Sequence, residues 1–385
     1  MHKLLISGYY GFDNNGDEAI LMSIIAALKC MNEGIKITAL SANPRVTADR
    51  YNIESVNRNK FSSIIKEIKK SDLFVSGGGS LLQDVTGWKS VPYYLGQVLL
   101  AQMMGKKTVF YAQGIGPVKN KAYRWLIKKV MGRADYISVR DKQSKRLLAD
   151  WGVEEEKIKL AVDPVFVLRN IAEDYTNSKE KDDTARGRNN EQIIKRDNGL
   201  ENTDERPLIG VSVRPWRGSI YLKNFATALS KFASTINADL AIIPFHLEED
   251  QQISNRLKDM VLSEWEDSGY QAYIEICEAD NPIKIMNIYE ELDFLLGVRL
   301  HSLIFAVVKN VPFVAVEYDP KVAGFLQMIG INSSVEIEDL DTGELNRICQ
   351  SIWSNRKKFA SILKQQGILL GRIALENALE LKKLI

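Results

Sequence analysis

An arginine and a histidine that could handle a small anion stand two residues apart in the segment Val298-Arg299-Leu300-His301. Histidine has a reference pKa of ~6.5, so it can hold and release a proton near neutral pH. Arginine offers a planar pair of N–H donors that suits a carboxylate or a phosphate. The pair therefore predicts a catalytic role for His301 in proton transfer, with a structural hydrogen bond as the alternative role of the histidine.

Further polar residues and glycines follow short apolar runs elsewhere in the chain. Together with Arg299, the cations Arg140 and Lys321 are predicted to hold a small, multiply charged anion. Asp17 is a candidate base or hydroxyl-binding residue, although an acid in the first turn of a helix also has a structural use. Backbone N–H groups of Gly77–Gly79 could approach an anion, and tight turns explain these glycines equally well.

Parallel sheets would position these residues, because short apolar runs alternate with helical patterns along most of the chain. In the first part, strands are expected at residues 3–7, 35–40, 73–76, 108–112 and 136–139, with helices at 17–31 and 142–151. In the second part, strands are expected at 208–213, 240–244, 273–276, 294–297 and 313–316, with a helix at 302–308. Ligands bind beyond the carboxyl ends of such strands, which is where the candidate residues fall.

The segment 172–206 divides the chain and is rich in charged and amide side chains. It has too few apolar residues to offset its ordering entropy, so it is predicted to be a flexible or partly helical linker, with a binding arm as the alternative. The expected architecture is α/β and doubly wound. It has Rossmann-like domains at 1–171 and 207–353, a cleft between them, and a C-terminal helix at 354–385.

Composition excludes several classes of protein. Of the 385 residues, 45% are hydrophobic and 26% charged, which is typical of soluble globular domains rather than of disordered or fibrous chains. The 51 basic and 49 acidic residues leave a net charge of +2, so nucleic acid is not expected as a partner. The three cysteines and three histidines lack zinc-site spacing, so neither a disulfide framework, a metal nor a cofactor is predicted.

No signal peptide or membrane-spanning run is recognisable, and a cytoplasmic protein is expected. The basic segment 119–133, KNKAYRWLIKKVMGR, is interpreted as a solvated helix face. Peripheral contact with anionic lipid headgroups at the inner face of the cell membrane is the alternative interpretation.

Several segments resemble, in order, the motifs of polysaccharide pyruvyl transferases: ISGYYGFDNNGDEAIL, DLFVSGGGSLLQD, AQGIGP, SVRD, GVRLHSLIFA and EYDPKV. GDEAIL and GVRLHS are the more specific parts. The resemblance covers nearly the whole chain, and 172–206 looks like an insertion. It is closest to the branch that pyruvylates secondary cell-wall polymers of Gram-positive bacteria and thereby helps to anchor S-layer proteins.

The resemblance implies a GT-B-like pair of Rossmann-type domains, phosphoenolpyruvate as donor, and a lipid-diphosphate-linked saccharide as acceptor, whose N-acetylmannosamine gains a 4,6-ketal of pyruvate. His301 would be the general acid, and either Asp17 or Glu317 the base. The remaining assignments are contacts to the two substrates. Donor contacts are expected from Arg140, Arg299, Lys321, Gly78 and Gly79, and acceptor contacts from Asn14, Arg214 and His246.

Two other functions fit the same residues. A GT-B glycosyltransferase that uses a nucleotide sugar could place its diphosphate on the same cations. A non-catalytic saccharide-binding protein would share the cleft but should tolerate loss of His301.

Overall fold

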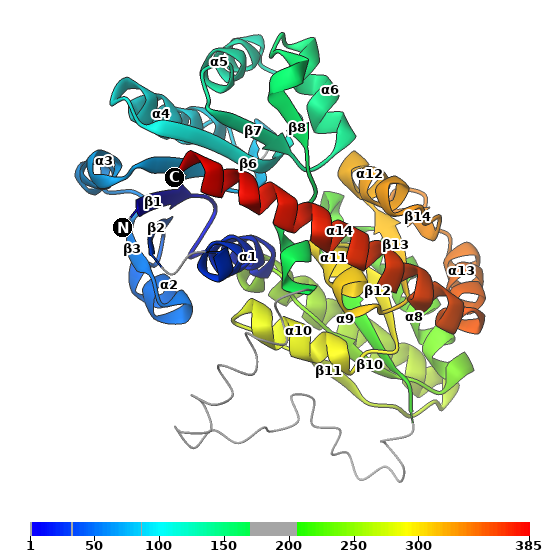
Figure 1. Ribbon diagram of the computed structural model, residues 1–385. Helices are drawn as coiled ribbons and strands as arrows, with labels where there is room; N and C mark the ends of the chain where they lie inside the picture. Colours follow the sequence, from blue (N-terminus) through cyan, green and yellow to red (C-terminus); the bar gives the residue numbers. More distant parts are fainter. Residues whose placement is uncertain (1, 32–33, 86, 170–205) are drawn as a thin grey trace. The chain divides into compact units, whose positions relative to one another are not determined.

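The computed structural model describes residues 2–31, 34–85, 87–169 and 206–385, and these form two compact units (Figure 1). Unit 1 contains Met1–Ile171 together with Leu369–Ile385, and unit 2 contains the described residues between them. The linker predicted at 172–206 lies, except for Arg206, outside the described residues.

Unit 1 is built on a parallel sheet whose strand order is β3-β2-β1-β4-β6-β7-β8, with β5 paired to β6 beside this path. The strands are β1 (His2–Ser7), β2 (Ile35–Ser41), β3 (Glu54–Asn57), β4 (Leu73–Ser76), β5 (Gly79–Leu82), β6 (Lys107–Ile115), β7 (Tyr136–Val139) and β8 (Ile158–Leu160). The helices between them are α1 (Asn15–Met31), α2 (Pro44–Tyr51), α3 (Phe61–Lys70), α4 (Ser90–Met103), α5 (Lys121–Met131) and α6 (Lys142–Asp150).

Alternation along these strands divides the apolar side chains between the two faces of the sheet. Leu5, Phe74 and Phe110 join one buried cluster with residues of α3, α4 and α5. The predicted end of a strand at Ala112 is wrong, because β6 continues to Ile115 across a register shift, with Ala112 at φ 47°. Gly79, expected in a turn, begins the short strand β5.

Unit 2 repeats the design with the parallel strand order β11-β10-β9-β12-β13-β14. Its strands are β9 (Leu208–Ser212), β10 (Asp239–Ile242), β11 (Ile274–Ile276), β12 (Phe294–Gly297), β13 (Phe313–Glu317) and β14 (Ser334–Glu336). Its helices are α8 (Leu222–Ile236), α9 (Leu247–Ser268), α10 (Pro282–Glu290), α11 (Leu300–Lys309), α12 (Pro320–Ile329) and α13 (Thr342–Ser354). Residues of α8, α9 and α13 pack with Val211, Leu296 and Val314 in one buried cluster.

The last helix, α14 (Arg356–Leu384), begins in unit 2 and supplies the final residues of unit 1. There it meets the sheet: Tyr136 donates a hydrogen bond to Asn377 Oδ1 at 2.8 Å, and Lys107 Nζ donates to the Leu384 carbonyl at 2.7 Å. Figure 1 shows this helix in red, ending beside β6.

Candidate functional site

Arg299 and His301 lie where strand β12 passes into α11. The helix begins at Leu300, two residues before its predicted start, so His301 lies in its first turn and Arg299 is the N-cap residue. The Arg299 carbonyl anchors this turn by accepting from the Ser302 hydroxyl at 2.6 Å and from the Ser302 backbone N–H at 3.0 Å. These two bonds fix the beginning of the helix, in whose first turn His301 lies.

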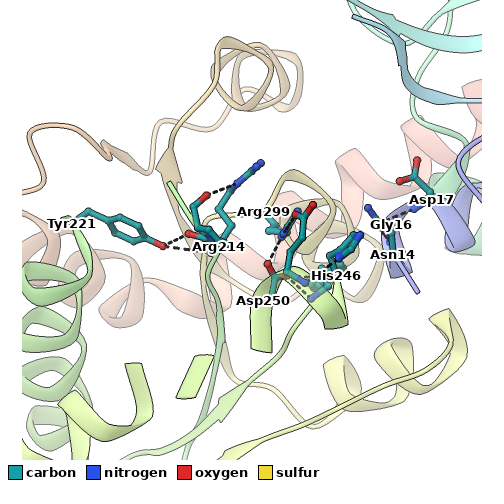
Figure 2. Close-up of polar contacts among 11 residues, drawn as sticks. Asn14, Gly16, Asp17, Arg214, Tyr221, His246, Asp250 and Arg299 are labelled. Carbon is teal, nitrogen blue, oxygen red and sulfur yellow. Dashed lines mark hydrogen bonds and ion pairs between the residues drawn. The ribbon is translucent and has the colours of Figure 1, made fainter. Parts of the chain in front are cut away.

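The Arg299 guanidinium is largely enclosed and paired with two carboxylates. Its Nη2 forms a short ion pair with Asp250, which is fully buried, and lies 3.1 Å from an oxygen of Glu249, which is half exposed. Figure 2 shows Arg299 directed at Asp250, with His246 alongside. Burial acts to lower the pKa of Arg299, but the interactions with Asp250, Tyr318 and Glu249 together outweigh burial and raise that pKa.

Asp250 also anchors the loop after β10. Its Oδ2 accepts from the backbone N–H groups of Phe245 and His246, at 3.1 and 3.0 Å. His246 in turn is the N-cap of α9, because its Nδ1 accepts from the Glu249 backbone N–H at 3.2 Å. One buried carboxylate thus connects the loops after β10 and β12.

Two buried nitrogens at this place have no hydrogen-bond partner among the described residues: Arg299 Nε and His246 Nε2. Since His246 Nδ1 acts as an acceptor, the proton of a neutral ring sits on Nε2. Both atoms are therefore donors, and a bound acceptor such as a carboxylate or phosphate oxygen would satisfy them.

Glu317 and Lys321 flank the turn between β13 and α12. Glu317 ends β13 and accepts a short hydrogen bond from the Ser334 hydroxyl. Lys321 lies in the first turn of α12, with its Nζ 3.6 Å from an oxygen of Asp319, and its side chain is 23% exposed. The ammonium is thus accessible for a further anionic contact.

Arg214 follows β9 and packs against aromatic rings. Its guanidinium carbon lies 4.3 Å from the centre of the Tyr318 ring and 5.9 Å from that of Trp216. Its carbonyl accepts from the Tyr221 hydroxyl at 2.8 Å, as Figure 2 shows. The two rings therefore hold the guanidinium in place by cation–π contacts.

In unit 1, Arg140 follows β7 and is buried. Its Nη1 lies 2.7 Å from Asp163 Oδ2, and its Nη2 donates to the Ser80 hydroxyl at 3.0 Å. Burial acts to lower the pKa of Arg140, but Asp163 and Asp141 outweigh it and raise that pKa. A Cβ on Gly114 would stand 2.9 Å from Arg140 Nε, so this glycine makes room for the guanidinium.

Asn14 and Asp17 lie at the beginning of α1. Asn14 Oδ1 accepts from the backbone N–H of Gly16 at 3.1 Å, which is the geometry of a helix cap (Figure 2). Gly79 has φ +96°, and a Cβ on it would stand 2.9 Å from Asp17 Oδ1. At Gly78 a larger side chain is disfavoured by packing, since a Cβ on this residue would stand 3.0 Å from Ile20.

Two buried residues hold the loop before α1: Glu18, which the sequence indicated only as an acid in a helix's first turn, and Arg58, which it did not indicate. Glu18 accepts from the Gly11 backbone N–H at 2.7 Å and from the Tyr51 hydroxyl at 2.6 Å. Arg58 donates to the Gly8 carbonyl at 2.9 Å and lies 5.0 Å from the centre of the Phe12 ring. Nothing local in the sequence marks Arg58, because its contacts are with residues far along the chain.

Asp250, Asp163 and Ser80 were missed as well. Asp163 precedes a proline, and Asp250 stands in the acidic start of α9, so each reads as an ordinary helix-start residue. Within the described ranges, no group of three or more histidine, cysteine or acidic side chains could hold a metal ion. In the same ranges, no helix combines the length and the hydropathy that crossing a membrane requires.

Comparison with sequence families gives one match over most of the chain. The model of the family described as polysaccharide pyruvyl transferase matches residues 14–320. A curated relative, the amylovoran biosynthesis protein AmsJ of Erwinia amylovora, is 19% identical over 429 aligned residues, which cover 96% of this chain and 98% of AmsJ.

Solved structures share the fold at low sequence identity. Anabaena HepE in complex with UDP-glucose has a TM-score of 0.61 and 12% identity, and the match covers 100% of both chains. A glycosyltransferase from Rickettsia africae has a TM-score of 0.63 and 16% identity, with 99% of this chain and 98% of that chain covered. UDP-GlcNAc 2-epimerase from Neisseria meningitidis, bound to UDP-GlcNAc, has a TM-score of 0.63 and 13% identity, over 98% and 100%. The prediction of two Rossmann-like α/β domains of the GT-B class is confirmed.

Proposed function

The chain belongs to the polysaccharide pyruvyl transferase family, and from that premise we propose that it transfers a pyruvyl group from phosphoenolpyruvate to an amino sugar, as a 4,6-ketal. Family membership makes the protein a transferase with a role in polysaccharide pyruvylation. The proposed acceptor is N-acetylmannosamine in a lipid-diphosphate-linked precursor of a secondary cell-wall polymer, of the kind that serves S-layer anchoring.

One observation carries the proposal: a largely enclosed arginine, whose buried Nε has no hydrogen-bond partner among the described residues, stands two positions before a histidine in a helix's first turn. The donor is an anion with a carboxylate and a phosphate, and its reaction begins with a proton transfer. Arg299 fits the first requirement because an arginine N–H binds such oxygens strongly. His301 fits the second because imidazole exchanges a proton near neutral pH.

In the proposed reaction, His301 gives a proton to C3 of the enol phosphate, so that C3 becomes a methyl group and positive charge is left at C2. One sugar hydroxyl attacks C2 and loses its proton. The C2–O bond to phosphate then breaks, and the second hydroxyl closes the ketal and also loses its proton. The base, Asp17 or Glu317, accepts these two protons in turn. One is passed on to His301, which is thereby restored, and the other leaves with the phosphate.

Each remaining residue has a proposed part in this reaction. Lys321 assists Arg299 in neutralising the donor, while Arg214 and His246 contact the acceptor. In unit 1, Arg140, Gly78 and Gly79 remain proposed donor contacts, and Asn14 a proposed acceptor contact. Asp17 and Glu317 are both retained as candidates for the base.

The test is to incubate the protein with phosphoenolpyruvate and a synthetic lipid-diphosphate disaccharide containing N-acetylmannosamine. We expect phosphate release only when both are present, and a product that gains an acid-labile pyruvyl group by mass spectrometry. A matched sugar methylated at O4 should give no product, because the ketal needs both hydroxyls. A parallel incubation uses a nucleotide sugar in place of phosphoenolpyruvate, because the fold resembles that of proteins that bind UDP-sugars. Turnover of the nucleotide sugar would replace this proposal with glycosyl transfer. Binding of the saccharide without any turnover would reduce the protein to a saccharide-binding one.

A further inference from the structure

Helix α5 of unit 1 carries an exposed stripe in which a tryptophan stands among lysines. Ile127, Val130 and Met131 are buried against the domain, so the opposite side of the helix faces outward. That outward side presents Lys121, Trp125, Lys128 and Lys129, at the spacing of one helix face. Trp125 is 61% exposed, which is unusual for so large an apolar side chain.

A second exposed tryptophan is attached to the same helix. Trp88 is 68% exposed, and its carbonyl accepts a hydrogen bond from the Tyr123 hydroxyl of α5 at 2.9 Å. This bond joins the segment before α4 to α5, and Figure 1 shows α4 and α5 as neighbouring helices of unit 1. Trp88 and Lys89 thus lie beside the helix that carries the exposed stripe. We use the name Trp–Lys face for the exposed residues of these two segments taken together, which are Trp88, Lys89, Lys121, Trp125, Lys128 and Lys129.

Each tryptophan of this face has a lysine over its ring. Lys89 Nζ lies 5.3 Å from the centre of the Trp88 ring, and Lys129 Nζ lies 5.8 Å from that of Trp125. Segment 119–133 contains no acidic residue, and Asp84, beside its start, accepts hydrogen bonds from the backbone N–H groups of Lys119 and Asn120. The Trp–Lys face therefore has a strongly positive charge in a chain whose overall net charge is +2.

We propose that the Trp–Lys face docks unit 1 on the surface of an anionic lipid bilayer. Tryptophan is favoured at the level of the headgroups, where its ring is buried and its N–H stays hydrated. Lysines beside it are attracted by the negative surface potential. Protein interfaces, in contrast, are depleted of lysine, so a partner protein fits this surface less well.

The proposal is tested by sedimenting the full chain with vesicles of phosphatidylcholine, with and without phosphatidylglycerol, and in rising salt. We expect binding that requires phosphatidylglycerol and weakens with salt. The double variant Lys128→Gln/Lys129→Gln should bind about 30-fold less at low ionic strength. Trp88→Ala/Trp125→Ala should bind at least about ten-fold less, because apolar surface no longer leaves water.

Controls come from unit 2. Lys357→Gln/Lys358→Gln removes the same charge from exposed positions on α14, and Ile220→Ala trims a side chain that is 86% exposed. Both should bind vesicles like the wild type, and all variants should keep the wild-type melting temperature. The measurement needs no donor or acceptor, so its result is independent of the proposed function.

Several outcomes would overturn the proposal. The first is that the protein does not bind vesicles at low salt, and the second is that it binds phosphatidylcholine alone as well as vesicles with phosphatidylglycerol. The third is that the Lys357/Lys358 control loses as much vesicle binding as the Lys128/Lys129 variant. Retention on heparin without vesicle binding would instead indicate a soluble polyanion. A concentration-dependent dimer that Trp125→Ala dissociates would assign the face to a second copy of the chain.

Discussion

The carboxylate of Asp250, in the first turn of α9, pairs with the guanidinium of Arg299, the residue that caps α11. The two helices follow strands β10 and β12, which lie on either side of β9 in the sheet of unit 2. The ion pair therefore links the beginnings of two helices whose preceding strands are not hydrogen-bonded to each other. It also fixes the orientation of the guanidinium whose Nε remains available to a ligand.

Replacing Asp250 with asparagine should impair donor binding through Arg299. The amide removes the buried negative charge opposite the guanidinium, so Arg299 loses its fixed orientation. We therefore expect the KM for the donor to rise at least about ten-fold. Steady-state kinetics of Asp250→Asn, Arg299→Gln and the double variant measure whether the two effects overlap. Glu249→Gln is the matched control, since Glu249 pairs with the same guanidinium from an exposed position, and it should change KM little. Fully additive losses in the double variant would show that Asp250 does not act through Arg299.

His301→Gln should separate proton transfer from binding. We expect turnover to fall by roughly 10²–10⁴-fold, the usual contribution of a positioned acid, with little change in donor affinity. Lys321→Ala should do the reverse and weaken donor binding, because it removes a charge-assisted contact. Turnover and donor titration, measured on both variants, distinguish the two effects. Near-normal turnover of His301→Gln would leave the histidine a structural residue, with His246→Gln as the next variant to test.

Arg140→Met should destabilise the protein whether or not Arg140 binds the donor. It removes the guanidinium that pairs with the buried Asp163 carboxylate, and breaking such an ion pair costs about 3–5 kcal/mol of the free energy of unfolding. The double variant Arg140→Met/Asp163→Leu should recover much of that loss, because no buried charge remains. Denaturant unfolding monitored by circular dichroism gives both values. An unfolding free energy unchanged in Arg140→Met would mean that the pair contributes nothing to stability and that Arg140 serves binding alone.

The three cysteines should differ sharply in reactivity. Burial raises the pKa of the Cys277 thiol to about 12, and it also raises the pKa of the buried Cys349. Both thiols are therefore protonated and enclosed at pH 8, whereas Cys30 is exposed on α1. Iodoacetamide at pH 8 should label Cys30 alone in the native protein and all three after denaturation, as peptide mapping would reveal. Rapid native labelling of Cys277 would indicate that its surroundings open.

Most strands could be predicted from the sequence because buried parallel strands are continuous apolar runs. The strand at 294–297 is confirmed with both ends correct, whereas the short, polar edge strand β3 gave no such signal. At the candidate site, the sequence indicated which residue types follow the strands, including Arg299 and His301. It did not indicate Asp250 as the partner of Arg299, because that pairing depends on how β10 and β12 are ordered in the sheet.

Helix α14 has a consequence for biosynthesis. Its last turns belong to unit 1, where Leu370, Ala374 and Leu381 are buried on one helix face. Asn377 accepts a hydrogen bond there from the Tyr136 hydroxyl. A ribosome therefore synthesises the whole of unit 2 before it completes the last helix of unit 1. Until translation passes residue 369, the nascent first unit lacks the cover that these side chains supply. A chain that ended between residues 369 and 385 would therefore lack part of the domain made first, whereas unit 2 would have all of its residues.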